Sequence, residues 1–412
     1  MSSVTTRGFL HLLLVAGLCG LAACRQAPPG DPNLRVVVWE HDDASVAPYI
    51  DSVLAAFCKL PGNEGVSIVR THYHTEDMRQ QFQTASIAGN PPDLLLSASD
   101  AAGIYSVSGF IQPVDGLFDL SRYNPAVVAA ITQDGRTWGV PVTNGNHLML
   151  FYNKRLASRP PRTTDELFAF CSGRAPKLGL DHCMAFHLGE PYWLVPWLGA
   201  FGGWPMAGRV PTLDTPAMRQ AVEFVMELKR RGFIPNECDY NGMDALFKEG
   251  KVAFIINGDW AISTYESQLR TDLGVAMIPK LSRTGRWPVP MVSGKYFMLS
   301  SQLQGRKLAL VKRLVEFYTG EENQVGQARA LKRLPALARA NNAKAIQDDP
   351  NLRASLDQIL VGKPLPMATE LRAVWDAMRP LFGKVLSGQM GADEAVRRMQ
   401  ADAETKIREM SE

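Results

Sequence analysis

The first hundred residues alternate between short apolar runs and longer stretches with helical spacing, which restricts the folds open to this chain. Arg35–Trp39 is a β-branched run that predicts a buried strand, and Val46–Leu60 has the spacing of an amphipathic helix. A strand, a helix and a second buried strand are predicted next, over Val66–Thr71, Glu76–Ile87 and Asp93–Leu96. Strands that alternate with helices in this way favour an α/β fold with a mainly parallel sheet.

The same kind of pattern continues through the rest of the chain. Further strands are predicted over Gly135–Val140, Leu148–Tyr152, Lys251–Ile256, Val275–Ile278 and Tyr296–Leu299. Pro216–Arg231 predicts a long amphipathic helix, and the chain is almost entirely helical from Lys307 to its end. A fold with 412 residues and this alternation has room for more than one α/β unit.

The charge and hydropathy of the chain exclude several classes of protein. Lys and Arg number 44 and Asp and Glu number 41, so the formal net charge is only +3. A nucleic-acid-binding protein needs a basic excess or a basic patch, and no block of five or six like charges occurs. Hydrophobic residues at 46% and charged residues at 21% are values of an ordinary globular protein, not of a disordered or polytopic membrane chain.

The N-terminus carries an export signal. Arg7 supplies a positive charge, Phe9–Leu18 is mostly apolar but too short to span a bilayer, and Leu-Ala-Ala-Cys24 follows. This pattern is similar to a bacterial lipobox, so residues 1–23 are predicted to be a lipoprotein signal peptide and Cys24 the lipidated N-terminus. Residues 24–33, which include three prolines, would form a tether. The alternative is an ordinary secretory signal that is followed by a cysteine by chance.

The remaining cysteines lie in a chain that is predicted to be exported, where disulfides can persist. Cys171 and Cys183 flank a loop that contains Pro and Gly, and a local bridge between them is plausible. Cys58 and Cys238 have no predicted partner. None of the four forms the Cys-x-x-Cys pairs of a structural zinc site, so the sequence predicts no metal and no cofactor.

Polar side chains follow four of the predicted strands, where an α/β sheet binds its ligands. The four segments are Glu40–Asp43, Ser97–Asp100, Thr143–Asn146 (with Asn144 and Asn146) and Asn257–Trp260. A fifth stretch, Phe186–Trp204, holds six aromatic residues. Aromatic faces stack on pyranose rings, and carboxylates and amides bond to hydroxyl pairs, so the combination favours a sugar site. Taken alone, each of these residues is also explained by a structural role, in the core, in a helix cap or in a turn.

Several longer motifs resemble the extracytoplasmic solute-binding proteins of ATP-binding-cassette sugar importers. The most specific is Phe247–Trp260, which is similar to the family's helix, Gly, strand and Asn-Gly-x-Trp signature. Four further matching segments are Gly109–Asp115 after Pro92-Asp93, Leu150–Lys154 after Val140-Pro141, Pro161–Leu167 and Val385–Ala395. The likeness runs from about Arg35 to the C-terminus.

The resemblance implies roles for particular residues, through the family's maltose-binding members. Phe186–Trp197 contains a Glu-Pro-Tyr segment, in which Glu190 would bond to sugar hydroxyls and Tyr192 would stack. Asp43 and Asp100 match sugar-binding aspartates, and Trp260 matches a stacking tryptophan.

The chain also departs from the family's pattern. Ser97 stands where a stacking Trp is expected, Ala101 where an Arg is expected and Ala44 where a Lys is expected. Gly145 or Asn146 replaces a carboxylate. These differences bear on which sugar is bound.

The family implies two α/β lobes, each a mainly parallel sheet flanked by helices, with the ligand cleft between them. Residues 34–143 and 292–345 would form the N-terminal lobe, and residues 146–290 and 346–412 the C-terminal lobe. The crossing segments are expected near Thr143–Asn146, Pro290–Gly294 and Asn341–Pro350. The implied function is that of a lipid-anchored receptor, which captures a maltose-like or malto-oligosaccharide-like carbohydrate and delivers it to membrane permease subunits.

The main alternative function is that of an enzyme, either a glycoside hydrolase or a metal-dependent enzyme. A polysaccharide-binding surface lipoprotein is a further alternative. Asp100 and Glu190 would be the carboxylate pair of a hydrolase. His72 and His74 would share one face of a strand, but no third metal ligand accompanies them. No phosphate-binding loop or Gly-x-Ser-x-Gly elbow occurs, and the chain is predicted not to be an enzyme.

Overall fold

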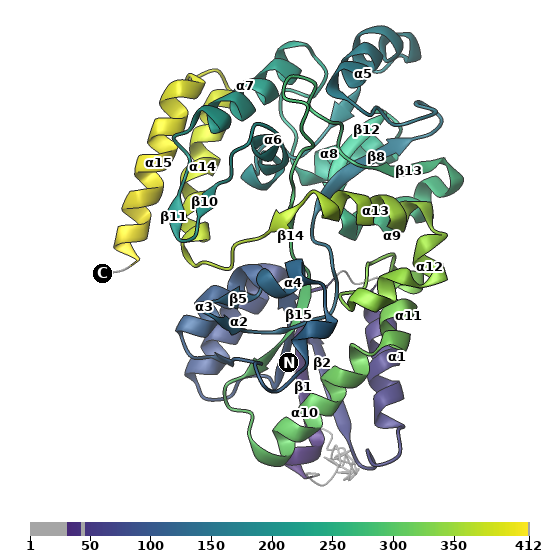
Figure 1. Cartoon of the computed structure of the whole chain (residues 1–412), viewed down its shortest axis with the longest axis vertical. Coiled ribbons are helices and arrows are strands. Elements are labelled where there is room, and N and C mark those ends of the chain that lie inside the picture. The colour runs from purple at the N-terminus through teal and green to yellow at the C-terminus, as the bar shows by residue number, and fades with distance from the viewer. Residues whose placement is uncertain (1–30, 43–45, 411–412) are drawn as a thin grey trace, which may run out of the picture.

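The computed structural model describes residues 31–42 and 46–410. This part of the chain forms two lobes, each with its own sheet and its own large hydrophobic core, and Figure 1 shows the N-terminal lobe below the C-terminal lobe. The two-lobed α/β architecture predicted from the sequence is therefore confirmed. The predicted signal peptide, Cys24 and Asp43 lie outside the described residues.

The N-terminal lobe contains a six-stranded sheet. Its strands are β1 (Arg35–Glu40), β2 (Ser67–His72), β3 (Leu94–Ala98), β4 (Ile111–Gln112), β7 (Val140–Pro141) and β15 (Lys295–Ser300). Strands β2, β1 and β3 are parallel, and β15 pairs with β3 in the antiparallel direction. Val36 and Val38 of β1 are 0% and 1% exposed, because their branched side chains fill the core as the apolar run predicted.

Helices cover this sheet on both faces. They are α1 (Ala47–Cys58), α2 (Thr75–Ile87), α3 (Ala102–Val107), α4 (Pro125–Ala129), α10 (Gly305–Tyr318) and α11 (Glu321–Leu331). The predicted strand over Gly135–Val140 is wrong. The chain there forms the short hairpin of β5 (Thr132–Gln133) and β6 (Arg136–Thr137), since Asp134 and Gly135 both adopt positive φ angles and turn the chain.

The C-terminal lobe is built on a sheet of four strands in the order β13-β8-β12-β9. The strands are β8 (Leu148–Asn153), β9 (Met184–Ala185), β12 (Phe254–Gly258) and β13 (Leu273–Ala276). Strands β9, β12 and β13 run in the same direction, as a mainly parallel sheet predicts, and β8 alone is reversed, because it is antiparallel to both β12 and β13. Strand β8 starts where the chain enters from the other lobe, whereas β12 ends at that same edge, so the two must run in opposite directions.

The helices of the C-terminal lobe pack around this sheet, and the last two form a pair at its side (Figure 1). They are α5 (Thr164–Ala169), α6 (Val195–Ala200), α7 (Pro216–Arg230), α8 (Tyr240–Lys248), α9 (Ile262–Leu269), α13 (Pro350–Leu360), α14 (Glu370–Leu386) and α15 (Ala392–Glu409). Helix α7 matches its prediction closely, because Thr215 caps its N-terminus and Pro216 stands in its first turn. None of the helices in the described ranges is long and apolar enough to cross a membrane.

Crossing segments lie side by side between the lobes. Gly145 forms a bridge with Ser293, and Thr143 forms one with Pro335. A Cβ atom on Gly294 would lie 1.9 Å from the Thr143 carbonyl oxygen, so this close approach requires glycine. The contacts bring the two predicted crossings near residues 143–146 and 290–294 together.

Short elements complete the region between the lobes. They are α12 (Lys344–Gln347), the antiparallel pair β10 (Met206–Ala207) and β11 (Val210–Pro211), and the parallel pair β14 (Met291–Val292) and β16 (Lys363–Pro364). After β16, Met367 packs into the core of the N-terminal lobe, which the sequence did not indicate.

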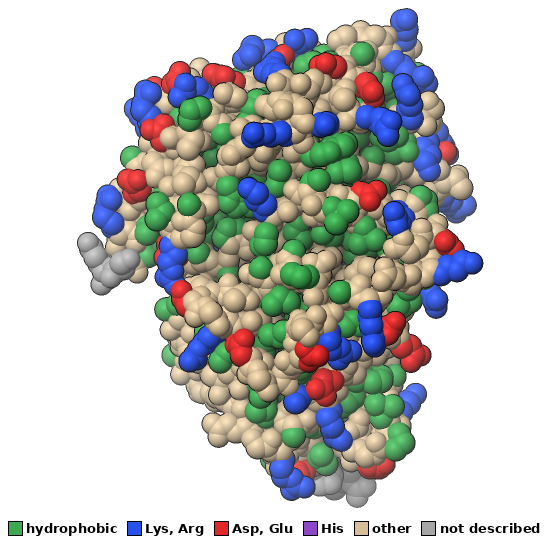
Figure 2. All heavy atoms as spheres, in the orientation of Figure 1, with side chains coloured by type: hydrophobic (Ala, Val, Ile, Leu, Met, Phe, Trp, Pro, Cys, Tyr) green, Lys and Arg blue, Asp and Glu red, His purple; other side chains and the backbone are tan. Residues whose placement is uncertain are grey.

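Apolar side chains gather across the middle of the face shown in Figure 2, and charged ones lie mostly around them.

A disulfide joins Cys171 to Cys183 inside the C-terminal lobe, with a Cα–Cα distance of 5.2 Å. This is the pair that the sequence singled out. Cys58 and Cys238 are free thiols.

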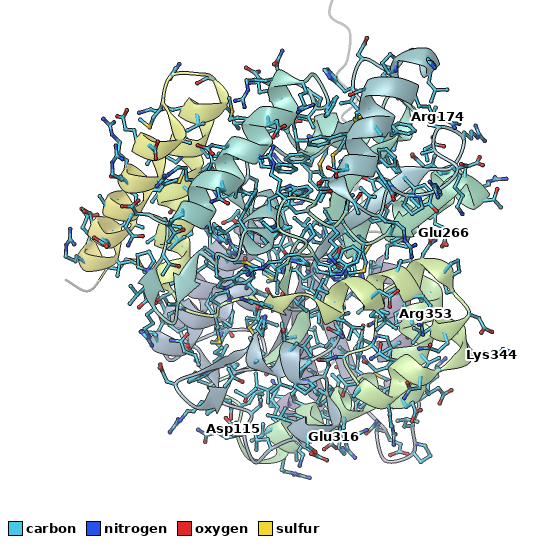
Figure 3. The ribbon with its side chains drawn as sticks, turned by 45° about the horizontal axis from the view of Figure 1, so that its top comes forward. Asp115, Arg174, Glu266, Glu316, Lys344 and Arg353 are labelled. Carbon is cyan, nitrogen blue, oxygen red and sulfur yellow. A yellow bond between two sulfur atoms is a disulfide. The ribbon has the colours of Figure 1, made fainter. Side chains whose placement is uncertain are left out.

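Charged residues such as Arg174 and Lys344 lie at the periphery of the molecule and point outward (Figure 3).

Candidate functional site

A cavity of about 330 Å³, called the inner cavity below, lies where the two lobes meet. Its walls come from the carboxyl end of β1, the start of α2, two crossing segments and the turn after β12. The lining residues are His41, Asp42, Thr75, Thr143, Asn146, Asp259, Trp260, Gly294, Lys295 and Arg333. The site thus lies outside the carboxyl ends of β1 and β12, where ligands of α/β sheets bind.

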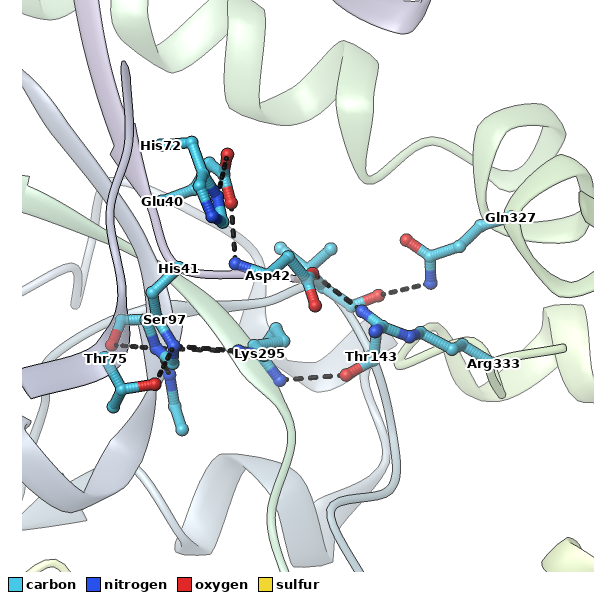
Figure 4. A network of polar contacts seen from close by, with 12 residues as sticks. Glu40, His41, Asp42, His72, Thr75, Ser97, Thr143, Lys295, Gln327 and Arg333 are labelled. Atoms are coloured by element: carbon cyan, nitrogen blue, oxygen red, sulfur yellow. Dashed lines mark hydrogen bonds and ion pairs between the residues drawn. The ribbon is translucent and has the colours of Figure 1, made fainter. Parts of the chain in front are cut away.

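Charged groups of both signs line this cavity (Figure 4). Arg333 Nη1 donates to Asp42 Oδ2 across 2.6 Å, and both side chains are less than 10% exposed. Burial alone would raise the pKa of Asp42, but the charges of Lys295 and Arg333 outweigh it and hold that pKa well below its usual range. Asp42 therefore stays ionised at neutral pH.

Lys295 stands at the start of β15 and faces the cavity. Its Nζ lies 3.5 Å from both ring nitrogens of His41, and burial lowers the pKa of the ammonium group. Burial and the charge of Lys295 also lower the pKa of His41 to about 3, so this imidazole is neutral. Its nitrogens contact Ser97 Oγ at 2.9 Å and Thr75 Oγ1 at 3.1 Å.

Asp259 enters the cavity from the C-terminal lobe. The backbone N–H of His147 donates to its Oδ1 across 3.3 Å, and burial raises the pKa of the carboxyl to about 6. A Cβ atom on Gly145 would lie 2.0 Å from Asp259 Oδ2, so glycine is required for the crossing segment to pass this carboxylate. Asp259 thereby links β12 to the first crossing segment.

Trp260 lines the inner cavity, as the sequence predicted for a residue just after Asn257-Gly258. Its indole is partly buried, and its Nε1 donates to Tyr240 Oη across 3.0 Å. The ring packs edge-on against Trp193, with a centroid separation of 6.4 Å. These contacts fix the orientation of the ring while part of it stays open to the cavity.

A second cavity of about 300 Å³, called the outer cavity below, lies between α2 and α3 of one lobe and α14 of the other. Asp100 lines it and forms an ion pair with Arg79. Trp375 and Arg372 line the facing wall on α14. The two cavities adjoin the same end of α2, since Thr75 lines the inner cavity and Glu76 the outer one.

Neither Glu190 nor Tyr192 of the Glu-Pro-Tyr segment is among the residues that line the inner and outer cavities. Tyr192 Oη donates to the carbonyl oxygen of Asn146 across 2.5 Å, and burial raises the pKa of this phenol well above its usual range. Glu190 forms an ion pair with Arg379 of α14, at 3.1 Å. Tyr192 is thus held against the first crossing segment, and Glu190 against α14.

The remaining predicted site residues differ in their positions. Asn146 lines the inner cavity with a positive φ of 49°, and its Nδ2 donates to Ser293 Oγ across 3.0 Å. Asn144 is 0% exposed and lines none of the cavities described above, and its amide has no hydrogen-bond partner among the described residues. Asp43 lies outside the described part of the chain.

Sequence reasoning missed four residues that line the two cavities, His41, Lys295, Arg333 and Trp375, and also Arg379, which pairs with Glu190. His41 belongs to a strand-end segment that was noted, but the other four stand in segments that the sequence indicates only as a strand, a helix connection and a helix. Trp375 and Arg379 are one helical turn apart on an amphipathic helix, which is the only sequence signal that they share a face.

The histidine pair that was weighed as a metal site has a different environment. His72 Nδ1 lies 3.1 Å from Glu40 Oε1, and the His72 and His74 rings are 6.1 Å apart. Over the residues that the structure describes, no group of three or more His, Cys, Asp or Glu side chains is arranged to hold a metal ion.

The match to known proteins decides the family. A family model described as "Bacterial extracellular solute-binding protein" matches residues 53–354, which is most of the chain. The chain belongs to this family. The resemblance drawn from the sequence motifs is thereby confirmed.

Relatives within this group are sugar-binding proteins of transporters. The maltose/maltodextrin-binding domain MalE from Bdellovibrio bacteriovorus bound to maltotriose has 32% identity, with a TM-score of 0.80 over 91% of this chain and 100% of that one. A maltotriose-binding protein of Pyrococcus abyssi is 25% identical over 87% of this chain and 79% of its own length. A maltooligosaccharide transporter solute-binding lipoprotein of Streptococcus pneumoniae is 25% identical over 98% of this chain and 95% of its own.

Proposed function

We propose that this protein binds a linear malto-oligosaccharide between its lobes and delivers it to an importer of the ATP-binding-cassette type. The observation that carries the proposal is the composition of the inner cavity, in which Lys295, Asp259 and Trp260 face one space. An ammonium group only donates hydrogen bonds and a carboxylate only accepts them, whereas a sugar hydroxyl does both. The indole offers the apolar face on which a pyranose ring stacks.

The outer cavity extends this argument along the cleft. Trp375 supplies a second aromatic face, and the ion-paired Asp100 and Glu190 hold acceptor oxygens near it. Tyr192 is tied to Asn146, so we assign it a role in shaping the cleft wall as well as in contacting sugar. A ligand that fills both cavities is longer than one sugar ring.

Ligand capture would close the lobes by turning about the crossing segments. We propose the lobe boundaries predicted above, with residues 34–143 and 292–345 in one lobe and residues 146–290 and 346–412 in the other, except that Met367 packs into the core of the N-terminal lobe. A ligand that contacts Lys295 on one lobe and Asp259 on the other binds the closed form better and shifts the equilibrium toward it. The closed complex would then dock on permease subunits in the membrane.

We propose that Cys24 carries the lipid that keeps the receptor at the membrane. The Leu-Ala-Ala-Cys motif supports this, as does the naming of the streptococcal relative as a lipoprotein. Replacing Cys24 by Ser should release the protein from the membrane fraction, and unchanged attachment would refute the lipid anchor.

We propose binding without turnover. In a retaining or inverting glycosidase, one carboxyl group must donate a proton to the leaving oxygen. Asp100 and Glu190 instead accept hydrogen bonds from Arg79 and Arg379. Malto-oligosaccharides incubated with the protein should stay intact by chromatography, and any hydrolysis would favour the glycosidase alternative.

A thermal-shift screen tests the proposal as a whole. A ligand that binds only the folded state raises the melting temperature by mass action. Linear malto-oligosaccharides should raise it in a concentration-dependent way, with cellobiose and sucrose as controls for linkage. A panel in which no carbohydrate raises the melting temperature would refute the proposed function.

A further inference from the structure

A third cavity, of about 290 Å³, lies in the C-terminal lobe beyond the cleft and is called the α14 cavity here. It is similar in volume to the inner and outer cavities. The lining residues include His187, Lys229, Asn236, Cys238, Asp239 and Gly383. The site described above does not include any of them.

Helix α14 connects the outer cavity with the α14 cavity. Trp375 lines the outer cavity, Arg379 pairs with Glu190, and Gly383 lines the α14 cavity. These three residues follow one another at intervals of four, so they lie on one face of the helix on successive turns. The distance along the axis from the first to the last is about 12 Å at 1.5 Å per residue.

The segment around Glu190, which faces α14, also leads toward the α14 cavity. Glu190 bonds to Arg379, while its neighbour Gly189 lines the α14 cavity. His187 also lines this cavity, and its pKa is lowered by burial against the opposing effect of the nearby Glu190 and Asp239 charges. Along α14, the Glu190–Arg379 pair therefore lies between Trp375 of the outer cavity and Gly383 of the α14 cavity.

The α14 cavity has the chemical character of the cleft. His187 Nδ1 is buried and has no hydrogen-bond partner within the described part of the chain, so it can bond to a ligand hydroxyl. Lys229, Asn236, Glu237 and Asp239 add donors and acceptors. Lys229 Nζ already donates to the carbonyl oxygen of Leu386, and Asp239 Oδ1 accepts from the backbone N–H of Gly242. Cys238, which is 8% exposed, contributes an apolar surface.

Gly383 lines the α14 cavity without a side chain. A Cβ atom there would meet nothing within 4 Å, so packing does not require glycine at this position. Glycine inside a helix is less favourable than alanine. The cost is offset if the free surface on this turn serves a ligand.

We propose that the α14 cavity is a distal subsite for the far end of a long, linear, neutral oligosaccharide whose other end fills the cleft. The inference rests on the proposed function, because it needs the cleft to bind the first sugar units. The chain of the ligand runs along α14, over the Glu190–Arg379 pair, and ends beside His187 and Gly383. A disaccharide or trisaccharide in the cleft does not reach this subsite.

The test is a calorimetric titration with linear malto-oligosaccharides from the disaccharide to the heptasaccharide. In the unaltered protein, the affinity should rise by about tenfold once the ligand passes Arg379, which corresponds to about 1.4 kcal/mol. Gly383→Phe should fill the subsite and remove this rise, while the affinity for maltotriose stays within about twofold. Lys384→Phe is the matched control, because Lys384 is exposed on the next position of the same helix and does not line the cavity.

Cys238 gives an independent readout without a variant. Its free thiol lines the α14 cavity, and we expect it to react slowly with a thiol reagent, because burial raises its pKa to about 11. The heptasaccharide should protect it further and maltotriose should not, with Cys58 of the other lobe as the internal reference. Equal labelling of Cys238 with either ligand would contradict the distal subsite.

The outcomes separate the two proposals. If no oligosaccharide of any length binds, the proposed function fails. If maltotriose binds but the affinity does not depend on length, or if Gly383→Phe leaves the length dependence unchanged, only the distal subsite is refuted.

Discussion

Lys295 and Asp259 line the same cavity from different lobes, and neither belongs to any of the ion pairs between described residues. Lys295 contacts His41, and Asp259 accepts a hydrogen bond from the backbone of His147. Burial lowers the pKa of Lys295 and raises that of Asp259, and the opposing charges of Asp42 and Arg333 do not reverse these shifts. Groups whose charged forms are disfavoured in this way are typical of sites where a ligand completes their bonding. In the proposed function, this pair would contact a polar ligand from both lobes.

Replacing Lys295 by Met should separate binding from stability. The substitution removes a donor from the cavity, so the affinity for maltotriose should fall by at least about tenfold, or 1.4 kcal/mol. It also removes a partly desolvated ammonium group, so the free energy of unfolding should stay constant or increase. Calorimetric titration and denaturant unfolding of the same variant measure the two effects. A less stable variant with unchanged affinity would show that Lys295 is structural.

Asp259 should make the stability of the protein depend on pH. Burial raises its pKa to about 6, above the ordinary 3.8, so the folded state holds this proton more tightly than the unfolded state. The contribution of this group to stability is therefore present below about pH 4 and is lost as the pH rises through 6. Two pKa units correspond to about 3 kcal/mol.

The Asp259→Asn variant measures this contribution. The difference in unfolding free energy between the original protein and the variant should change by up to about 3 kcal/mol between pH 4 and pH 7. The original protein should lose stability relative to the variant as the pH rises. A difference that is constant over this range would contradict the raised pKa of Asp259.

Trp260→Ala should weaken sugar binding by about 1–3 kcal/mol, the scale of a desolvated aromatic contact. Because the ring is only partly buried, the loss of stability should be smaller than for a core tryptophan. Trp197→Ala is the control, since Trp197 is 0% exposed and should cost about 3–5 kcal/mol of stability with little effect on affinity. The reverse pattern in the two variants would remove Trp260 from the site.

The disulfide between Cys171 and Cys183 should stabilise the C-terminal lobe. It closes a short loop, with a sequence separation of 12, for which chain entropy predicts about 2–3 kcal/mol. The double variant Cys171→Ser and Cys183→Ser should lower the unfolding free energy by this amount and leave maltotriose binding intact. Stability that does not respond to reductant in the original protein would contradict this contribution.

Much of the fold could be predicted from local patterns. The Val-Val-Val run of β1 and the capped amphipathic helix α7 have strong periodic signals, and the structure has both within a residue or two. The direction of β8 could not be read in this way, because strand direction depends on where the chain enters the lobe. The hairpin at Asp134-Gly135 was missed because its two strands have only two residues each.

The residues of the candidate site could be predicted only where they belong to a recognisable sequence motif. Trp260 follows the Asn-Gly-x-Trp signature, and the structure places it in the inner cavity. Lys295 and Arg333 carry no such signal, because their positions become neighbours only when separate crossing segments come together. The same is true of Trp375, whose helix shows its apolar face in the sequence but not which lobe or cavity that face meets.

Calorimetric titration of the protein with maltotriose tests the central claim most directly. The account predicts saturable binding of one ligand per chain, which Lys295→Met weakens by at least about tenfold and Trp260→Ala by about 1–3 kcal/mol. A folded protein that shows no binding of maltotriose, or binding that neither variant alters, would contradict the account.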